Sequence, residues 1–288
     1  MENKKPFENI MVATDGSERA KMAFWLALTF YDKTELFDQI IVAHVSDKSK
    51  TYLPDLWKPE FIYNEYKTSL LTRFPSDKYK LCFEEKRNNV ESCRDQILQM
   101  AQSMKVSFLF IGFTGRKGDK QNQTVLSQTV KHSAFHSSVP LVIVKELSER
   151  KNMQTKGFTF LACVDGSQKS YTAMKRVFNL ASDEHDKIVV CYAPLRDKQG
   201  YANTIKAEVQ EQLKDQPKKK WTFTFLKPSF KPDQAICKYI NDAEEHWINF
   251  VVIGNNGYRA MVEKKSFFGT YAETILINAN ANIIVVSQ

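Results

Sequence analysis

No stretch of this 288-residue sequence approaches the roughly 18 consecutive apolar residues that a membrane-spanning helix needs. The N-terminal residues Met1 to Pro6 have no apolar segment behind them, so they do not resemble a secretory signal. We therefore expect a cytoplasmic protein that has no membrane partner.

Cysteine is scarce, and its five copies are scattered and odd in number, which excludes a disulfide framework as the basis of the fold. Three of them lie in apolar runs typical of strands. We interpret the cysteines as small buried side chains in a reducing compartment, rather than as disulfide partners or metal ligands. They are Cys82, Cys93, Cys163, Cys191 and Cys237.

The usual signatures of catalysis are also missing. The sequence has no Gly-Lys-Ser/Thr phosphate loop, no kinase signature set and no nucleophile elbow. His132 and His136 lie four positions apart on a predicted helix, a spacing that can bind a metal, but no third ligand accompanies them. We predict neither catalytic residues nor a metal site.

Charge of one sign is in excess, with a formal net charge of +8. Part of the excess is clustered at Lys218–Lys220, at Arg116 and Lys117, and at Lys264 and Lys265. A basic surface favours anionic partners, although it also serves solubility alone. Because there is no recognition-helix pattern and no aromatic ribonucleoprotein motif, nucleic acid is not an expected partner.

What the sequence does contain is an internal repeat. Val12–Ser17 returns as Ala162–Ser167, 150 positions later, and both copies end in Asp-Gly-Ser. Phe108–Gly115 returns as Asn249–Gly257, with the aligned glycines 112 and 254 separated by 142 positions. A nearly constant offset indicates two tandem copies of one domain, for which we predict the boundaries 1–147 and 157–288.

Each half alternates apolar runs with amphipathic segments, which predicts a parallel sheet covered by helices on both faces. Right-handed crossovers then give two tandem α/β domains, each a doubly wound sheet of the Rossmann-like or flavodoxin-like type. We predict strands at 9–14, 39–45, 79–85, 107–112, 139–144, 158–164, 187–193, 221–226, 249–253 and 282–286. We predict helices at 17–30, 60–74, 90–104, 127–136, 168–181, 201–213, 232–245 and 269–279.

In an open α/β sheet, ligands bind beyond the carboxyl ends of the strands at the switch point. Glycines there let the backbone approach a ligand closely, and a helix N-terminus offers unpaired amides to phosphate. The second half brings both features together, with Lys264 and Lys265 nearby in sequence. The candidate binding residues are Asp165, Gly166, Ser167, Gly254, Asn255, Gly257, Gly269 and Thr270.

On these motifs the chain resembles the tandem universal stress proteins over nearly its whole length. ATP-binding members carry Gly-x-x-Gly, a somewhat shorter loop, and then Gly-Ser or Gly-Thr. Here Gly254-x-x-Gly257 is followed by residues 258 to 268 and then by Gly269-Thr270. The resemblance implies that Asp165 lies near the nucleotide and that the backbone at Tyr192 and Ala193 holds the adenine, with ATP as the cofactor and Mg²⁺ accompanying it.

The first half departs from this pattern. It retains Asp15, Gly112 and Gly115, but it has Thr124-Val125 where the last helix is expected to open with Gly-Ser. Threonine carries a Cβ where phosphate needs close approach, and valine offers no hydroxyl. We expect this first site to be weak or empty.

The resemblance implies an adenine-nucleotide-binding sensor or switch, with at most slow ATP hydrolysis. It also implies that residues 139–144 and 282–286 pair within one chain to form an intrachain pseudo-dimer, which would cover two sheet edges. The alternative is a structural or interaction protein that kept the fold and binds an acidic partner such as tubulin or another filament. In that case the protein would be associated with the cytoskeleton.

Structural interpretations of the same residues also remain open. Glycines commonly occur in loops for backbone reasons alone. Asp15 and Asp165 could act as turn or cap residues, since Asp-Gly-Ser is a good helix-start signal. Phe267 and Phe268 favour a role as core anchors over adenine stacking.

Overall fold

The computed structural model describes residues 9–33, 36–116, 127–145, 157–181, 185–216, 221–242, 247–255 and 269–287. The chain divides into two compact units, Met1–Leu147 and Ser148–Gln288. Within the described ranges, no helix is long and apolar enough to cross a membrane.

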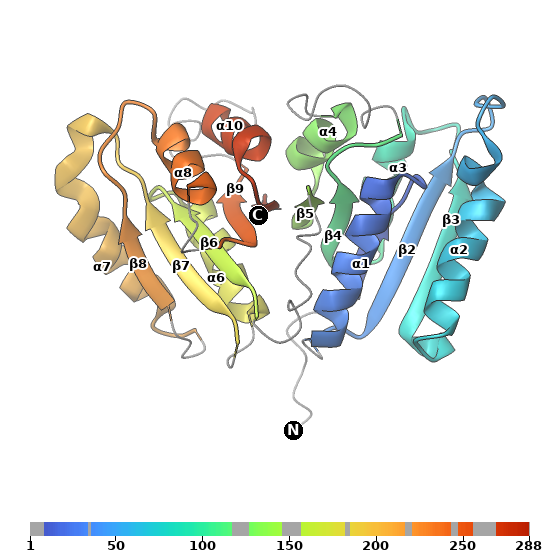
Figure 1. Cartoon of the computed structure of the whole chain (residues 1–288), viewed down its shortest axis with the longest axis horizontal. Coiled ribbons are helices and arrows are strands. Elements are labelled where there is room, and N and C mark those ends of the chain that lie inside the picture. The colour runs from blue at the N-terminus through green and yellow to red at the C-terminus, as the bar shows by residue number, and fades with distance from the viewer. Residues whose placement is uncertain are drawn as a thin grey trace. The chain divides into compact units, whose positions relative to one another are not determined.

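The N-terminal unit is a five-stranded parallel sheet in the order β3-β2-β1-β4-β5 (Figure 1). Its strands are β1 (Asn9–Ala13), β2 (Gln39–Ser46), β3 (Tyr79–Glu85), β4 (Val106–Gly112) and β5 (Leu141–Val144). Its helices are α1 (Glu18–Lys33), α2 (Pro59–Leu71), α3 (Cys93–Ser103) and α4 (Gln128–His136), with the short 3-10 turns η1 (Asp55–Trp57) and η2 (Ser76–Lys78).

The C-terminal unit repeats this topology, with the parallel strand order β8-β7-β6-β9-β10. Its strands are β6 (Thr159–Val164), β7 (Lys187–Tyr192), β8 (Trp221–Phe225), β9 (Phe250–Gly254) and β10 (Asn282–Val286). Its helices are α6 (Gln168–Leu180), α7 (Ala202–Leu213), α8 (Pro232–Asn241) and α10 (Thr270–Asn278), and the 3-10 turn η3 (Arg196–Tyr201) precedes α7.

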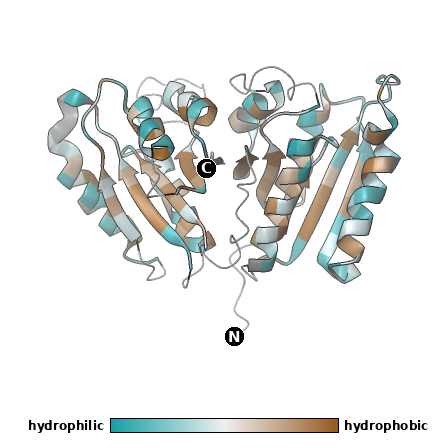
Figure 2. Cartoon of the chain, in the orientation of Figure 1, coloured by the Kyte–Doolittle hydropathy of each residue, from teal (hydrophilic) through white to brown (hydrophobic). Residues whose placement is uncertain are grey.

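Helices cover both faces of each sheet, which explains why the central strands are apolar throughout rather than alternating. Figure 2 shows these strands as almost uniformly hydrophobic, whereas the helices carry both polar and apolar residues. In the N-terminal unit an ion pair joins Lys21 of α1 to Glu65 of α2, and His132 of α4 contacts Asp95 of α3. The pairing of α1 with α2 and of α3 with α4 is what right-handed crossovers on opposite faces produce.

The predicted doubly wound α/β fold is therefore confirmed, and each predicted strand and helix has a counterpart. Some helix boundaries differ from the predicted ones, because the capping residue was not identified from the sequence. The helix predicted at 90–104 begins only at Cys93, because the Ser92 hydroxyl accepts a hydrogen bond from the Asp95 amide at 3.3 Å and acts as the N-cap. All five cysteines are free thiols, and Cys82, Cys191 and Cys237 are buried.

Candidate functional site

The switch point of the C-terminal unit lies between β6 and β9. The chain leaves β6 toward β7 on one side and leaves β9 toward β10 on the other, so the two loops part above the carboxyl ends of these strands. Ligands of open α/β sheets bind in such a crevice. All the sequence-predicted binding residues that the structure describes follow the ends of β6, β7 and β9 or open α10.

The Asp165-Gly166-Ser167 turn links β6 to α6. One carboxylate oxygen of Asp165 accepts hydrogen bonds from the Ser167 amide at 3.0 Å and from its hydroxyl at 2.6 Å. Gly166 has a φ of +86°, a left-handed conformation that favours glycine. The Ser167 hydroxyl also accepts a hydrogen bond from the Ser170 amide at 3.2 Å. The structural interpretation of Asp165 is thus supported, while its side chain stays exposed at the crevice.

Asn255 connects three segments around the crevice. Its side-chain oxygen accepts a hydrogen bond from Lys169 Nζ at 3.0 Å, and its main-chain oxygen accepts one from the Gly269 amide at 3.2 Å. Its own amide donates to the carbonyl of Val286 at 3.0 Å. Because Asn255 is buried, these contacts fix the start of α10 and the lysine of α6 against the end of β9.

Among the described residues, the N-terminus of α10 has no side-chain cap. Gly269 is its N-cap residue and offers no hydroxyl or carboxylate to the first amides of the helix. In the N-terminal unit, the corresponding position 142 residues earlier is Ser127, whose hydroxyl accepts a hydrogen bond from the Val130 amide at 3.1 Å. The two units thus differ in whether the last helix caps itself.

The end of β7 lies beside the end of β6, since Val164 and Tyr192 are paired in register. Ala193, the predicted adenine contact, directly follows this pair and is half-buried. Burial raises the pKa of the Tyr192 phenol, and the negative charges of Asp165 and Tyr201 raise it further. The phenol therefore stays protonated and can donate a hydrogen bond near the carboxylate.

Part of the predicted site lies outside the described residues. This applies to Gly257, to the basic pair Lys264 and Lys265, and to Phe267 and Phe268. In the N-terminal unit it also applies to Thr124 and Val125. The structure opens that unit's last helix after Ser127, so the counterpart of Gly269 is Ser127 rather than Thr124.

The first glycine of each Gly-x-x-Gly motif has a packing explanation. A Cβ at Gly112 would lie 2.6 Å from the main-chain carbonyl carbon of Arg19, at the start of α1. A Cβ at Gly254 would lie 3.1 Å from Cβ of Lys169 and 3.2 Å from its carbonyl carbon, at the start of α6. These glycines let a helix start lie close to the end of a strand, whether or not a ligand binds.

Arg116 bridges the equivalent crevice of the N-terminal unit. Its amide donates to the Asp15 carboxylate at 3.2 Å, its Nε donates to the main-chain oxygen of Asp15, and its Nη2 donates to the main-chain oxygen of Trp57 at 3.2 Å. The guanidinium carbon lies 5.7 Å from the centre of a Trp57 ring, within cation–π distance. A side chain from the β4 loop therefore spans the exit of β1 and reaches η1.

Sequence reasoning missed this bridge, although Asp15 and Gly115 were both recognised. A Cβ on Gly115 would lie 2.9 Å from the Asp15 carboxylate, so this glycine brings the β4 loop onto the aspartate. From the sequence, the basic cluster that begins at Arg116 is expected to be surface, either for an anionic partner or for solubility alone. Its first member is instead half-buried, and burial lowers the pKa of its guanidinium.

His44 lies beneath the same crevice and is buried. Its Nδ1 lies 2.8 Å from the main-chain oxygen of Thr14, so Nδ1 carries the proton and donates it. The Thr14 hydroxyl lies 2.8 Å from the hydroxyl of the buried Tyr66 and accepts a hydrogen bond from the Gly16 amide at 3.2 Å. Desolvation lowers the pKa of His44 and the Arg116 charge lowers it further, while the Thr14 carbonyl and Asp15 oppose the shift.

This shift predicts that the N-terminal unit loses stability in mild acid. Because the folded pKa lies below the ordinary value, the unfolded chain binds a proton first as the pH falls, and His44 then favours unfolding. The loss begins near pH 6.5 and amounts to at most about 1.4 kcal/mol per pH unit until the folded pKa is reached. Urea unfolding between pH 7.5 and 5 measures it. A His44→Asn variant, which keeps a donor for Thr14, should show a smaller slope, and an equal slope would contradict the assignment.

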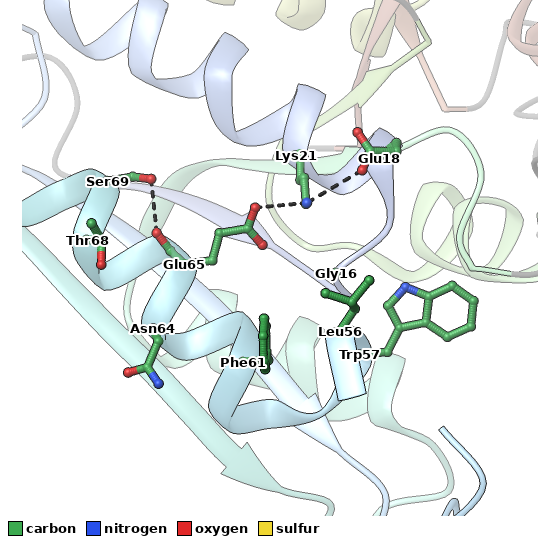
Figure 3. Close-up of a pocket in the computed structure, with 10 residues that line it drawn as sticks. All are labelled: Gly16, Glu18, Lys21, Leu56, Trp57, Phe61, Asn64, Glu65, Thr68 and Ser69. Carbon is green, nitrogen blue, oxygen red and sulfur yellow. Dashed lines mark hydrogen bonds and ion pairs between the residues drawn. The ribbon is translucent and has the colours of Figure 1, made fainter. Parts of the chain in front are cut away.

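A separate groove of about 660 Å³ lies between α1 and α2 (Figure 3). Lys21 reaches into it and lies 2.8 Å from a Glu65 oxygen and 3.5 Å from a Glu18 oxygen. The hydrogen bond to Glu65 is the main cause of the raised pKa of Lys21. Two carboxylates against one ammonium make this groove unsuitable for phosphate.

The histidine pair is at the α3–α4 contact. His132 Nε2 lies 2.6 Å from an Asp95 oxygen, and its ring centre is 4.3 Å from that of His136. Desolvation lowers the pKa of His132 despite the nearby Asp95 carboxylate. In the part of the chain that the structure describes, no group of three or more His, Cys, Asp or Glu residues could hold a metal ion.

Comparison with known proteins identifies the fold. No family model and no curated protein matches the sequence. A universal stress protein from Archaeoglobus fulgidus matches in structure, with a TM-score of 0.67 and 15% identity over 97% of this chain and 98% of that one. A functionally unknown protein from Pseudomonas aeruginosa matches with a TM-score of 0.65 and 12% identity, over 100% and 95% of the two chains. The chain therefore has the fold of a tandem universal stress protein, as its repeated motifs predict.

Proposed function

We propose that the C-terminal unit binds an adenine nucleotide at the switch point between β6 and β9. The phosphates would bind the N-terminal amides of α10 at Gly269 and Thr270. Asp165, Gly166 and Ser167 would border the ribose side, and the adenine would contact the backbone at Ala193. Gly254, Asn255 and Gly257 would complete the loop around the ligand, and Mg²⁺ would arrive with ATP.

The uncapped N-terminus of α10 is the observation that carries this proposal. Helix termini leave several amides without intrahelical partners, and a side chain usually satisfies one of them. Gly269 provides no such group, whereas Ser127 does so in the other unit. An uncapped positive helix end at a switch point suits phosphate. Lys169, fixed on Asn255 at 3.0 Å, adds a positive charge at the same place.

The N-terminal unit is proposed to bind no nucleotide. Its last helix is capped by Ser127, and Arg116 bridges the loops that a ligand would have to separate. A nucleotide would have to break the contacts of Arg116 with Asp15 and Trp57 and displace a satisfied cap. We therefore propose a nucleotide sensor in which only the C-terminal unit of each chain binds the nucleotide.

The proposed role is binding rather than turnover. Asp165, the carboxylate beside the crevice, is hydrogen-bonded to Ser167 and serves the turn. A general base must be free to reach the attacking water at hydrogen-bond distance. No side chain of the described residues is proposed as a base, so the expected hydrolysis is slow at most.

Titration calorimetry with ATP and Mg²⁺ tests the proposal directly. We expect one site per chain. Two sites per chain would contradict the proposal that the N-terminal unit binds no nucleotide. No binding by protein shown to be folded would refute the proposal and favour a structural role for the whole chain.

A further inference from the structure

A second anionic partner is indicated by the segment that contains β8. Residues 216–232 hold no acidic side chain. The segment also holds four aromatic residues, which lie between the basic ones: Trp221, Phe223, Phe225 and Phe230. The lysines are Lys218, Lys219, Lys220, Lys227 and Lys231. Within the described ranges, this segment is the edge of the C-terminal sheet, because β8 pairs with β7 alone.

Aromatic side chains are exposed where β7 and β8 end. Phe230 is 73% exposed, Tyr201 is 58% exposed and Phe225 is 43% exposed. Large apolar side chains are normally covered unless they contact a partner, and a group of them on one edge indicates an interaction site. The ring of Phe225 lies 6.1 Å from that of Tyr192, which anchors it to the end of β7.

The backbone holds this edge in place. Leu195 and Ser229 form a parallel bridge, the Arg196 amide donates to the Ser229 carbonyl at 3.2 Å, and the Ser229 amide donates to the Pro194 carbonyl at 3.1 Å. The guanidinium of Arg196 then lies over the Phe230 ring at 5.0 Å. The exposed phenylalanine and the arginine thus lie together, and we call them the Arg196–Phe230 platform.

At the described part of this edge, the basic side chains have no ion-pair partner within the part of the chain that the structure describes. Among the described residues, no carboxylate forms an ion pair with Arg196, Lys227 or Lys231, and Lys227 and Lys231 are exposed. The matching edge strand of the N-terminal unit differs. There β3 carries Lys80 together with Glu84 and Glu85, and Gln96 hydrogen-bonds to both glutamates. Mixed charge is a usual means of blocking contacts at a sheet edge.

We infer that the Arg196–Phe230 platform and the adjoining β8 edge bind single-stranded nucleic acid. Unpaired bases stack on exposed aromatic rings, while lysine and arginine contact the phosphates. Each unpaired nucleotide brings a flat base for a ring and a phosphate for a cation, whereas an acidic side chain brings the charge alone. The sequence offered no standard motif for this function, because the elements are an edge strand and a loop that only the fold brings together.

Fluorescence anisotropy with a labelled oligouridylate of about 12 nucleotides tests the inference. We expect Phe230→Ala to weaken RNA binding about tenfold, since one stacking contact is lost. We expect the double variant Lys227→Ala, Lys231→Ala to weaken the salt dependence of RNA binding. The negative slope of log K against log salt concentration should become shallower by about 1.4, because two phosphate contacts are lost. Polyglutamate serves as the anion without bases, and its binding should be unchanged by Phe230→Ala.

Matched controls come from the other unit. Lys80→Ala on β3 and Tyr52→Ala, which removes a side chain that is 69% exposed, should leave RNA binding within about twofold, because neither residue belongs to the unit that carries the proposed site. Absence of RNA binding at low micromolar protein would overturn the inference. An equal loss of RNA and polyglutamate binding in Phe230→Ala would also overturn it, and so would unchanged RNA binding in that variant. Either result would favour an acidic protein as the partner.

Discussion

Replacing Gly112 with alanine is expected to destabilise the N-terminal unit by about 3 kcal/mol, the upper range for a group forced into a packed site. The new Cβ would lie 2.6 Å from the carbonyl carbon and 2.8 Å from the carbonyl oxygen of Arg19. Both atoms belong to the backbone at the start of α1, so no side-chain rotation can relieve the overlap. The start of α1 would have to move away from β4.

The same change at Gly254 should cost less, about 1 kcal/mol, because its Cβ would stay at least 3.1 Å from Lys169. Gly200→Ala is the control, since a Cβ there meets nothing within 4 Å. Urea unfolding gives the free energies, and hydrogen exchange of β4 and β9 amides assigns each change to its unit. A Gly112→Ala variant as stable as the parent would contradict the close approach of α1 and β4.

This comparison bears on how glycine motifs are interpreted. Both copies of Gly-x-x-Gly have their first glycine, although the two units differ at the residue that opens the last helix. Packing against α1 or α6 accounts for this glycine in each unit. The first glycine therefore supports the fold and carries little information about a ligand. The difference between Ser127 and Gly269 carries much more.

The fold was predictable because local and global signals agree. The repeated Asp-Gly-Ser turns each place a glycine at positive φ, 80° at Gly16 and 86° at Gly166, and each is followed by a helix. Buried strands such as Leu141–Val144 are apolar at every position, as parallel sheets covered on both faces require. Whether Leu141–Val144 and Asn282–Val286 pair within the chain stays a prediction.

The site was predictable only in part, since long-range contacts decide it. The sequence identified Asp15 as the counterpart of Asp165 but could not indicate that Arg116, about a hundred positions later, contacts it. It predicts the last helix of the first half at 127–136, but the family motif was matched to Thr124-Val125, although the counterpart of Gly269 is the capping residue Ser127. A serine before an amphipathic run is a recognised start signal, and aligning the two units on this signal pairs Ser127 with Gly269.

Replacing Gly269 with serine is expected to weaken ATP binding at least tenfold while the protein stays folded. The substitution copies Ser127, whose hydroxyl binds the amide three residues later at 3.1 Å. A hydroxyl at position 269 would satisfy the amide of Ala272 and add a Cβ at the proposed phosphate site. Charge-assisted hydrogen bonds contribute about 1.5–3 kcal/mol each, so losing one accounts for a tenfold effect or more.

Serine is a better N-cap than alanine or valine and about as good as glycine, so α10 should remain stable in this variant. Calorimetry with ATP and Mg²⁺ measures the loss, and thermal unfolding without nucleotide verifies the fold. Gly269→Val should also abolish ATP binding, because its side chain blocks the phosphate site although it cannot cap the helix. The reciprocal Ser127→Gly variant, in the unit that Arg116 closes, should leave the stoichiometry at one. Unchanged affinity in Gly269→Ser would show that the α10 terminus is not the phosphate site, because a capped helix cannot offer the same amides to a ligand.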